Sequence, residues 1–121
     1  ATVQHTKDRF LEGVAEHNLG FLHLEQHRYD DAEHHYERAL EIAREIGDLD
    51  GQGFALNDLG SIAGQRFQYS RCIDLLRQAA GIARQTGNGN SEIMALSNLG
   101  FNFIQLAQYE IADEYLEQGL L

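Results

Sequence analysis

Apolar residues recur along this 121-residue chain with the spacing of α-helices. From Phe10 to Leu24 they fall on one helical face, and a second stripe runs from Ala32 to Ala43. A strand would instead show strict alternation of apolar and polar residues. The same pattern then returns twice and predicts an all-α chain of about six antiparallel helices, near 10–26, 30–46, 50–66, 70–86, 90–106 and 110–121.

Helix boundaries are marked by residues that favour caps and turns. The segment 27–29 predicts a turn, after which Asp30 or Asp31 is well placed as the N-cap of the second helix. Gly47 then predicts a C-cap, since glycine readily adopts the left-handed conformation found there. The Gly-Asn-Gly-Asn segment at 87–90 is predicted to be a cap and turn, because it lacks the Lys-Ser/Thr pair of a phosphate-binding loop.

A repeat of forty residues organises the chain. Residues 8–47 and 48–87 are identical at eleven of forty positions without a gap, and the third copy keeps the same landmarks. The repeats are predicted at about 8–47, 48–87 and 88–121, within one array. Each carries a mid-helix glycine that costs about 1 kcal/mol relative to alanine. Three such glycines predict close helix–helix approach at Gly20, Gly60 and Gly100.

The landmarks resemble the tetratricopeptide repeat family, in its forty-residue subclass. A Leu-Gly pair in each first helix is followed by a tyrosine at the turn, and then by small, large and small residues along the second helix. These residues are Leu19-Gly20, Leu59-Gly60 and Leu99-Gly100; Tyr29, Tyr69 and Tyr109; and Ala32, Tyr36, Ala39, Cys72, Leu76, Ala79, Ala112, Leu116 and Gly119. The resemblance implies a solenoid, a right-handed superhelix of stacked helix pairs.

One position departs from the family pattern. Glu16 stands where the family usually has an aromatic residue and where the other two repeats have Leu56 and Leu96. A carboxylate at a normally buried site predicts that the first repeat packs less tightly than the second, or that it has lost a neighbour.

Charge and cysteine content narrow the range of partners. The net charge is −10 and Lys7 is the only lysine, so phosphate backbones and anionic lipids would be repelled. A basic protein or peptide is favoured, and neither nucleic acid nor membrane is expected as a partner. Cys72 has no second cysteine to pair with, which fits a reducing, cytoplasmic compartment. No apolar run reaches the roughly 20 residues of a membrane span.

Catalytic and metal chemistry find little support in the sequence. The acidic residues fall mainly on exposed helix faces, and no nucleophile stands with a base, so no enzyme activity is predicted. His23 and His27 have the spacing of two ligands on one helix face, but no cysteine or second histidine pair supports them. Neither a metal nor another cofactor is expected.

The resemblance also implies where a partner would bind, because in this family the first helices line a concave groove. Groove positions carried onto this chain are His17, Asn18, Phe21, Asn57, Asp58, Ser61, Met94, Ser97, Asn98, Phe101 and Gln105. None of these is a lysine or arginine, which argues against capture of a C-terminal carboxylate. Asn18 and Asn98 would either grip a peptide backbone or bond within the array, and the sequence does not separate these readings.

The predicted function is a protein–protein interaction scaffold that binds an extended peptide or a partner helix, within a larger signalling or regulatory protein. Two alternatives stay open: a structural segment that self-associates, and a peptide-sensing regulatory module. For self-association we expect an uncapped C-terminal end that supports a homodimer, through Leu116, Leu120 and Leu121.

Overall fold

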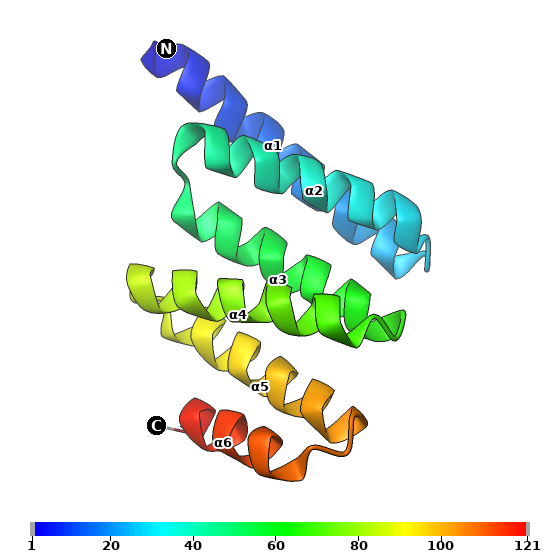
Figure 1. Cartoon of the computed structure of the whole chain (residues 1–121). Helices are drawn as coiled ribbons and strands as arrows, with labels where there is room; N and C mark the ends of the chain where they lie inside the picture. Colours follow the sequence, from blue (N-terminus) through cyan, green and yellow to red (C-terminus); the bar gives the residue numbers. More distant parts are fainter. Residues whose placement is uncertain (1, 121) are drawn as a thin grey trace.

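The computed structural model describes residues 2–120, without the side chain of Leu120. Six helices follow one another in antiparallel pairs, and the pairs stack in chain order (Figure 1). The all-α, six-helix fold predicted from the sequence is confirmed. The helices are α1 (Val3–Glu25), α2 (Tyr29–Ile46), α3 (Leu49–Gln65), α4 (Tyr69–Thr86), α5 (Gly89–Gln105) and α6 (Tyr109–Leu120).

Helix α1 begins earlier than the apolar pattern predicted. Its first turn starts at Val3, where the Thr2 hydroxyl accepts a hydrogen bond of 3.0 Å from the His5 backbone N–H. The residues before Phe10 are largely polar and exposed, so they carry no apolar stripe. A side-chain cap and the absence of glycine or proline are enough to extend the helix there.

The remaining caps follow a rule that repeats. Helices α2 and α4 are followed by the C-cap residues Gly47 and Gly87, whose φ angles of 72° and 74° are left-handed. The next residues, Asp48 and Asn88, cap α3 and α5 by accepting hydrogen bonds from backbone N–H groups three residues later. The expected cap at Asp30 or Asp31 was wrong, because α2 already begins at Tyr29 and both aspartates lie in its first turn.

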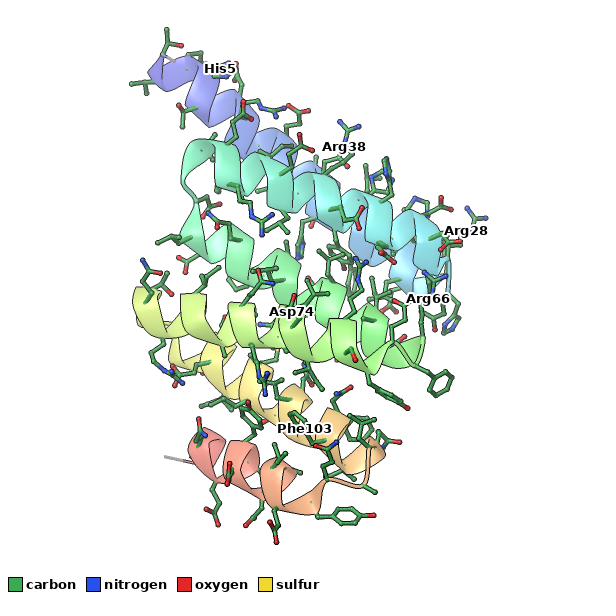
Figure 2. The ribbon with its side chains drawn as sticks, viewed as in Figure 1. His5, Arg28, Arg38, Arg66, Asp74 and Phe103 are labelled. Carbon is green, nitrogen blue, oxygen red and sulfur yellow. The ribbon has the colours of Figure 1, made fainter. Side chains whose placement is uncertain are left out.

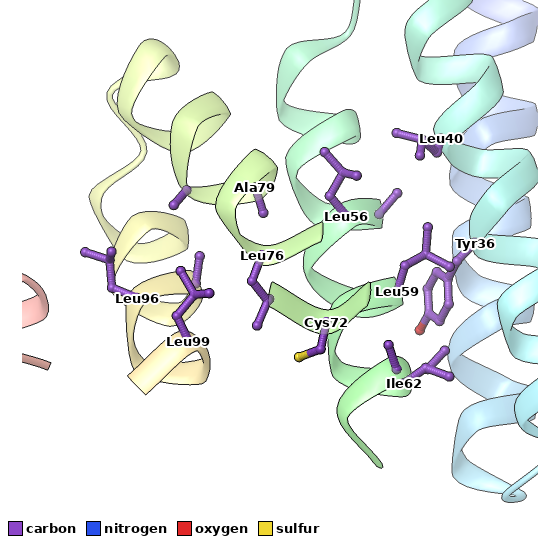
Figure 3. Close-up of a cluster of buried hydrophobic side chains, with 14 of the residues drawn as sticks. Tyr36, Leu40, Leu56, Leu59, Ile62, Cys72, Leu76, Ala79, Leu96 and Leu99 are labelled. Atoms are coloured by element: carbon purple, nitrogen blue, oxygen red, sulfur yellow. The ribbon is translucent and has the colours of Figure 1, made fainter. Parts of the chain in front are cut away.

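A continuous core lies between the helix pairs (Figure 3). Its largest fully buried side chains are Tyr36, Leu56, Ile62, Leu76, Leu96 and Leu99. The mid-helix glycines allow this packing. A Cβ atom on Gly20 would lie 2.9 Å from the Tyr36 ring, and one on Gly60 would lie 2.8 Å from Leu76. Such distances are too short for a carbon–carbon contact, so the predicted close approach is confirmed.

Burial is uneven along the array. Leu19 is 40% exposed, whereas Leu59 at the equivalent position of the second repeat is 3% exposed and packs in the core. Gly20 is the only described residue of α1 that is buried. Helix α1 is therefore less covered than α3. The packing of α1 on α2 is as extensive as that of α3 on α4, so the looser packing predicted from Glu16 is not seen between the two helices of the first repeat.

Ion pairs tie the first repeat to the second on the side where the pairs turn. Arg66 reaches back to Asp30 at 2.8 Å, and Arg71 reaches Glu33 at the same distance. Figure 2 shows Arg66 at this turn end of the array, close to Arg28. These contacts pair two carboxylates of α2, Asp30 and Glu33, with arginines of the second repeat.

Candidate functional site

Two hollows lie between successive first helices of the array. Helices α1, α3 and α5 are the first members of their pairs, and α3 and α5 also contact each other directly. We call the face that they form the first-helix face. The first hollow lies between α1 and α3, and the second lies between α3 and α5.

The first hollow has a volume of about 320 Å³ and mainly apolar walls. Phe10, Val14 and Phe54 are each nearly half exposed, so their side chains present apolar surface to a partner. The second helix contributes the rest of the apolar lining, through Ala39, Ile42, Ala43 and Ile46. A hollow of this kind accepts an apolar side chain, because burial there removes apolar surface from water.

Two carboxylates border this apolar lining. Asp48 and Asp50 line the hollow where α2 passes into α3. His17 also lines the hollow, and its Nε2 lies 2.8 Å from Oδ2 of Asp58, a contact that joins α1 to α3. The His17 ring also meets the edge of Tyr36, at 5.2 Å between centroids. Burial, and then the charges of Asp58 and Glu25, raise the pKa of Tyr36, so its hydroxyl stays neutral.

The second hollow is smaller, about 220 Å³, and differs in chemistry. Its lining combines four side-chain amides and two hydroxyl-bearing residues with apolar groups, and no described residue of the lining carries a charge at neutral pH. Helix α3 contributes Ser61, Gly64 and Gln65; α4 contributes Tyr69, Cys72 and Leu76; and α5 contributes Asn98, Phe101, Asn102 and Gln105.

Comparison with known proteins agrees with this architecture. The sequence model of the tetratricopeptide repeat matches residues 11–85, which is more than half of the chain. The chain belongs to the tetratricopeptide repeat family. Tetratricopeptide repeats are in general protein-interaction modules. A search of curated protein sequences gives no match.

Solved tetratricopeptide domains have the same fold. The TPR domain of Arabidopsis FLU superposes with a TM-score of 0.86 at 17% identity, covering 93% of this chain and 94% of that one. The N-terminal domain of stress-induced protein-1 from C. elegans gives 0.80 at 18% identity, covering 93% and 84%. At these identities the likeness concerns the fold alone.

The tetratricopeptide array gathers some of the predicted groove residues and separates others. Four of them share the second hollow, namely Ser61, Asn98, Phe101 and Gln105, whereas His17 lines the first. Asp58 joins the first hollow only through its contact with His17. Four more are exposed but line neither hollow: Asn18, Phe21, Met94 and Ser97.

Asn57 differs from the prediction. It is buried, at 4% exposure, and its Oδ1 has no partner within residues 2–120. In the first and third repeats the equivalent positions carry His17 and Ser97, which are half-buried and exposed. Helical periodicity places these three residues on one face, but the depth of that face depends on the neighbouring helices.

Sequence reasoning missed the second-helix residues that complete both hollows. Ile42 and Ile46 were not assigned to any site, and Cys72 was predicted only as one of the small residues of the second helices. Asn102 was also missed, although a signal existed. It stands where the first two repeats have Leu22 and Ile62, and a polar residue in an apolar column is unusual.

Other chemistry in the array is limited. Burial raises the pKa of the Cys72 thiol, which keeps it protonated and unreactive. His23 and His35 stack face to face at 5.2 Å, yet the described residues contain no group of three or more side chains that could hold a metal ion. No described helix is both long and apolar enough to cross a membrane.

Proposed function

We propose that this tetratricopeptide array is a non-catalytic scaffold, within a larger cytoplasmic regulatory protein, that binds a segment of another protein along its first-helix face. An apolar side chain of the partner enters the first hollow, and a neighbouring lysine or arginine lies against its carboxylates. The observation that carries this proposal is the apolar lining bordered by Asp48 and Asp50.

The charge of the chain supports the basic part of the proposal. A net charge of −10 attracts a basic segment at long range, and Asp50 is exposed and available at short range. Asp48 already accepts a hydrogen bond from the Gly51 backbone N–H, so it attracts a basic residue through its negative charge and is not required to bind it directly. Partner specificity then comes from the hollow, and attraction comes from the carboxylates.

The backbone of the partner would be held by side-chain amides. Asn98 lies at the second hollow and is half-buried, so a carboxamide that both donates and accepts is presented toward a bound chain. Asn18 is exposed and lies outside both hollows, and we assign it a secondary role. Cys72 is a free, buried thiol, which supports a cytoplasmic setting.

A selection experiment tests this function. A library of random peptides displayed on phage is panned against the immobilised 121-residue chain. We expect enrichment of peptides with an aromatic or large aliphatic residue next to lysine or arginine, bound more weakly as salt is raised. Asp50→Asn should weaken binding of a selected peptide by about 1.4-fold to fivefold, which corresponds to the roughly 0.2–1 kcal/mol of an exposed ion pair.

Asp74→Asn is the matched control. It removes the same charge from an exposed position on α4, outside both hollows (Figure 2). Equal losses from Asp50→Asn and Asp74→Asn would mean that only net charge matters. Enrichment of acidic peptides, or of none, would contradict the proposed function.

Self-association is a second candidate, favoured by one observation. Leu116 is 38% exposed, whereas Tyr36 and Leu76 at the equivalent positions are fully buried. Leu121 and the side chain of Leu120 lie outside the described residues. If this surface pairs, light scattering should show a mass that rises with concentration and salt and falls with Leu116→Lys, but not with Val3→Lys at another exposed position.

A further inference from the structure

Three carboxylates of α2 hold two arginines of the next repeat. Arg66, the C-cap residue of α3, lies 2.8 Å from Asp30 and 3.3 Å from Glu33. Arg71, in the first turn of α4, lies 2.8 Å from Glu33 and 3.2 Å from Glu37. We call the three acids the α2 triad. The first repeat junction is therefore an interface in which an acidic second helix meets arginines on both sides of the following turn.

The same triad recurs on α6, two repeats later. Its members are Glu110, Asp113 and Glu117, and all three are exposed. Helix α6 contains no lysine, arginine or histidine, so this charge is not balanced within the helix. The corresponding positions of α4 carry no acid: Ser70, Ile73 and Arg77. The triad is thus a property of α2 and α6 and not of every second helix.

At the second junction, too, the two sides match in character. Leu106 and Ile111 stand where the second repeat has its two arginines. Ile73 of α4 stands where α2 has Glu33, and both Ile73 and Leu106 are partly buried against the core. Acids on a second helix therefore go with arginines in the next repeat, and an apolar residue goes with apolar residues. By the same relationship, the α6 triad fits a helix pair that carries arginines.

The face of α6 that carries the triad also presents apolar surface. Leu116 packs on α5, where a Cβ atom on Gly100 would lie 2.6 Å from it, yet Leu116 is 38% exposed. The equivalent Tyr36 and Leu76 are fully buried, and Tyr36 shares a core cluster with Leu59 of the following repeat. A helix that covered Leu116 in the same way would remove apolar surface from water.

We propose that this face of α6 binds a helix pair of another protein, which covers Leu116 and sets two arginines against the α6 triad. The arginines lie five residues apart, on either side of the turn, as Arg66 and Arg71 do. A second copy of this chain does not supply them, because its first repeat has Gln26 and Asp31 at these positions. The residues involved line neither hollow, so this partner is additional to the one on the first-helix face.

The full chain can be altered to supply the missing arginines itself. The Gln26→Arg, Asp31→Arg variant changes two exposed positions, which correspond to Arg66 and Arg71. Its α1 offers apolar surface, since Leu19 and Leu22 are 40% and 50% exposed at positions that are buried in α3. The variant should associate head to tail at least about fivefold more tightly than the parent chain in sedimentation equilibrium, and less tightly as salt is raised.

Matched variants separate the triad from net charge. Asp74→Arg with Gln78→Arg makes the same change of charge at two exposed positions of α4, and should give no comparable gain. In the chain with Gln26→Arg and Asp31→Arg, adding Asp113→Lys should remove the gain. Adding Glu114→Lys, on the same helix but outside the triad, should leave at least about half of it. Circular dichroism should show that every variant stays helical.

The assignment is overturned if the Gln26→Arg, Asp31→Arg variant associates no more tightly than the α4 control, or if Asp113→Lys and Glu114→Lys have equal effects. It is also overturned if the parent chain pairs just as tightly, because a second copy would then be the occupant. None of these outcomes bears on peptide selection at the first hollow, which is measured separately with Asp50→Asn.

Discussion

The carboxylate of Glu16 on α1 lies 2.7 Å from Nδ1 of His35 on α2. Its second oxygen lies 3.2 Å from Nε of Arg38. The Glu16 side chain is only 13% exposed, and the equivalent Leu56 and Leu96 are buried in the core. A position that is apolar in two repeats therefore holds a carboxylate in the first, compensated by two cationic or hydrogen-bonding partners.

Glu16→Leu should raise the free energy of unfolding by about 1 kcal/mol. Replacing a largely buried ion pair by an apolar residue is often neutral or stabilising, and His35 and Arg38 can reach water once released. Glu16→Ala should instead lower it by about 0.5–1 kcal/mol, because the contacts are lost with no gain of apolar burial. Urea unfolding followed by circular dichroism measures both, and destabilisation by leucine would show that the polar contacts stabilise the repeat.

Gly60→Ala should lower the free energy of unfolding by about 1–3 kcal/mol, despite the higher helix propensity of alanine. The new Cβ would lie 2.8 Å from the Leu76 side chain, which is fully buried, so α3 and α4 must shift or Leu76 must change its rotamer. Gly81→Ala is the control and should stabilise by up to about 1 kcal/mol, since nothing lies within 4 Å. Stabilisation by both substitutions would refute the close approach of α3 and α4.

Tyr36→Phe should increase stability, and more so at high pH. Burial raises the pKa of Tyr36 in the folded chain, so the unfolded chain ionises first, near pH 10. The unfolded state then binds fewer protons than the folded state, and the free energy of unfolding falls as pH rises above 10.

The Tyr36→Phe variant has no hydroxyl to ionise at this position, so its stability does not fall in this way. Its free energy of unfolding relative to the parent chain should therefore grow by about 1 kcal/mol between pH 8 and pH 11. The Tyr36 hydroxyl has no hydrogen-bond partner among the described residues, so its loss at neutral pH should not destabilise. Tyr109→Phe, at an exposed position, should leave the pH profile unchanged. An advantage for Tyr36→Phe that is independent of pH would contradict the shifted titration.

Phe67→Gly should stabilise the chain by about 0.5–1 kcal/mol. Phe67 has a φ of 63° in the turn between α3 and α4 and is 76% exposed, so it is strained without contributing much burial. A residue with a Cβ atom pays about 1–2 kcal/mol in this left-handed region, which glycine largely avoids. Phe101→Gly, within α5, should destabilise by about 1 kcal/mol. Loss of stability in Phe67→Gly would mean that the contact with the Tyr69 ring outweighs the strain.

The repeat, the helices and their glycine C-caps could be read from the chain because they depend on local order. The forty-residue period and the apolar spacing of three to four residues can both be counted along the sequence. Gly47 adopts its φ of 72° because glycine has no Cβ atom, whatever packs around it. The Leu-Gly pair, repeated in each first helix, likewise indicated the tetratricopeptide family from the sequence alone. Even the close approach at Gly60 followed from the cost of a glycine inside a helix.

The candidate site could be predicted only in part. The first-helix positions were found from the family pattern, and Ser61, Asn98, Phe101 and Gln105 do meet in one hollow. Their shared location is a consequence of α3 and α5 lying side by side, which the repeat implies. Asn57 occupies an equivalent position and is nevertheless buried, because the depth of a position depends on the side chains packed over it.

What the sequence by itself determined is a tetratricopeptide-like chain of six helices with an acidic surface. Only the tertiary structure decided that the first-helix face carries hollows of different chemistry, one apolar with carboxylates and one lined by uncharged residues. The reason is physical. Each hollow is a volume left over when side chains from three helices pack, and a missing side chain such as that at Gly64 becomes visible only when its neighbours are in place.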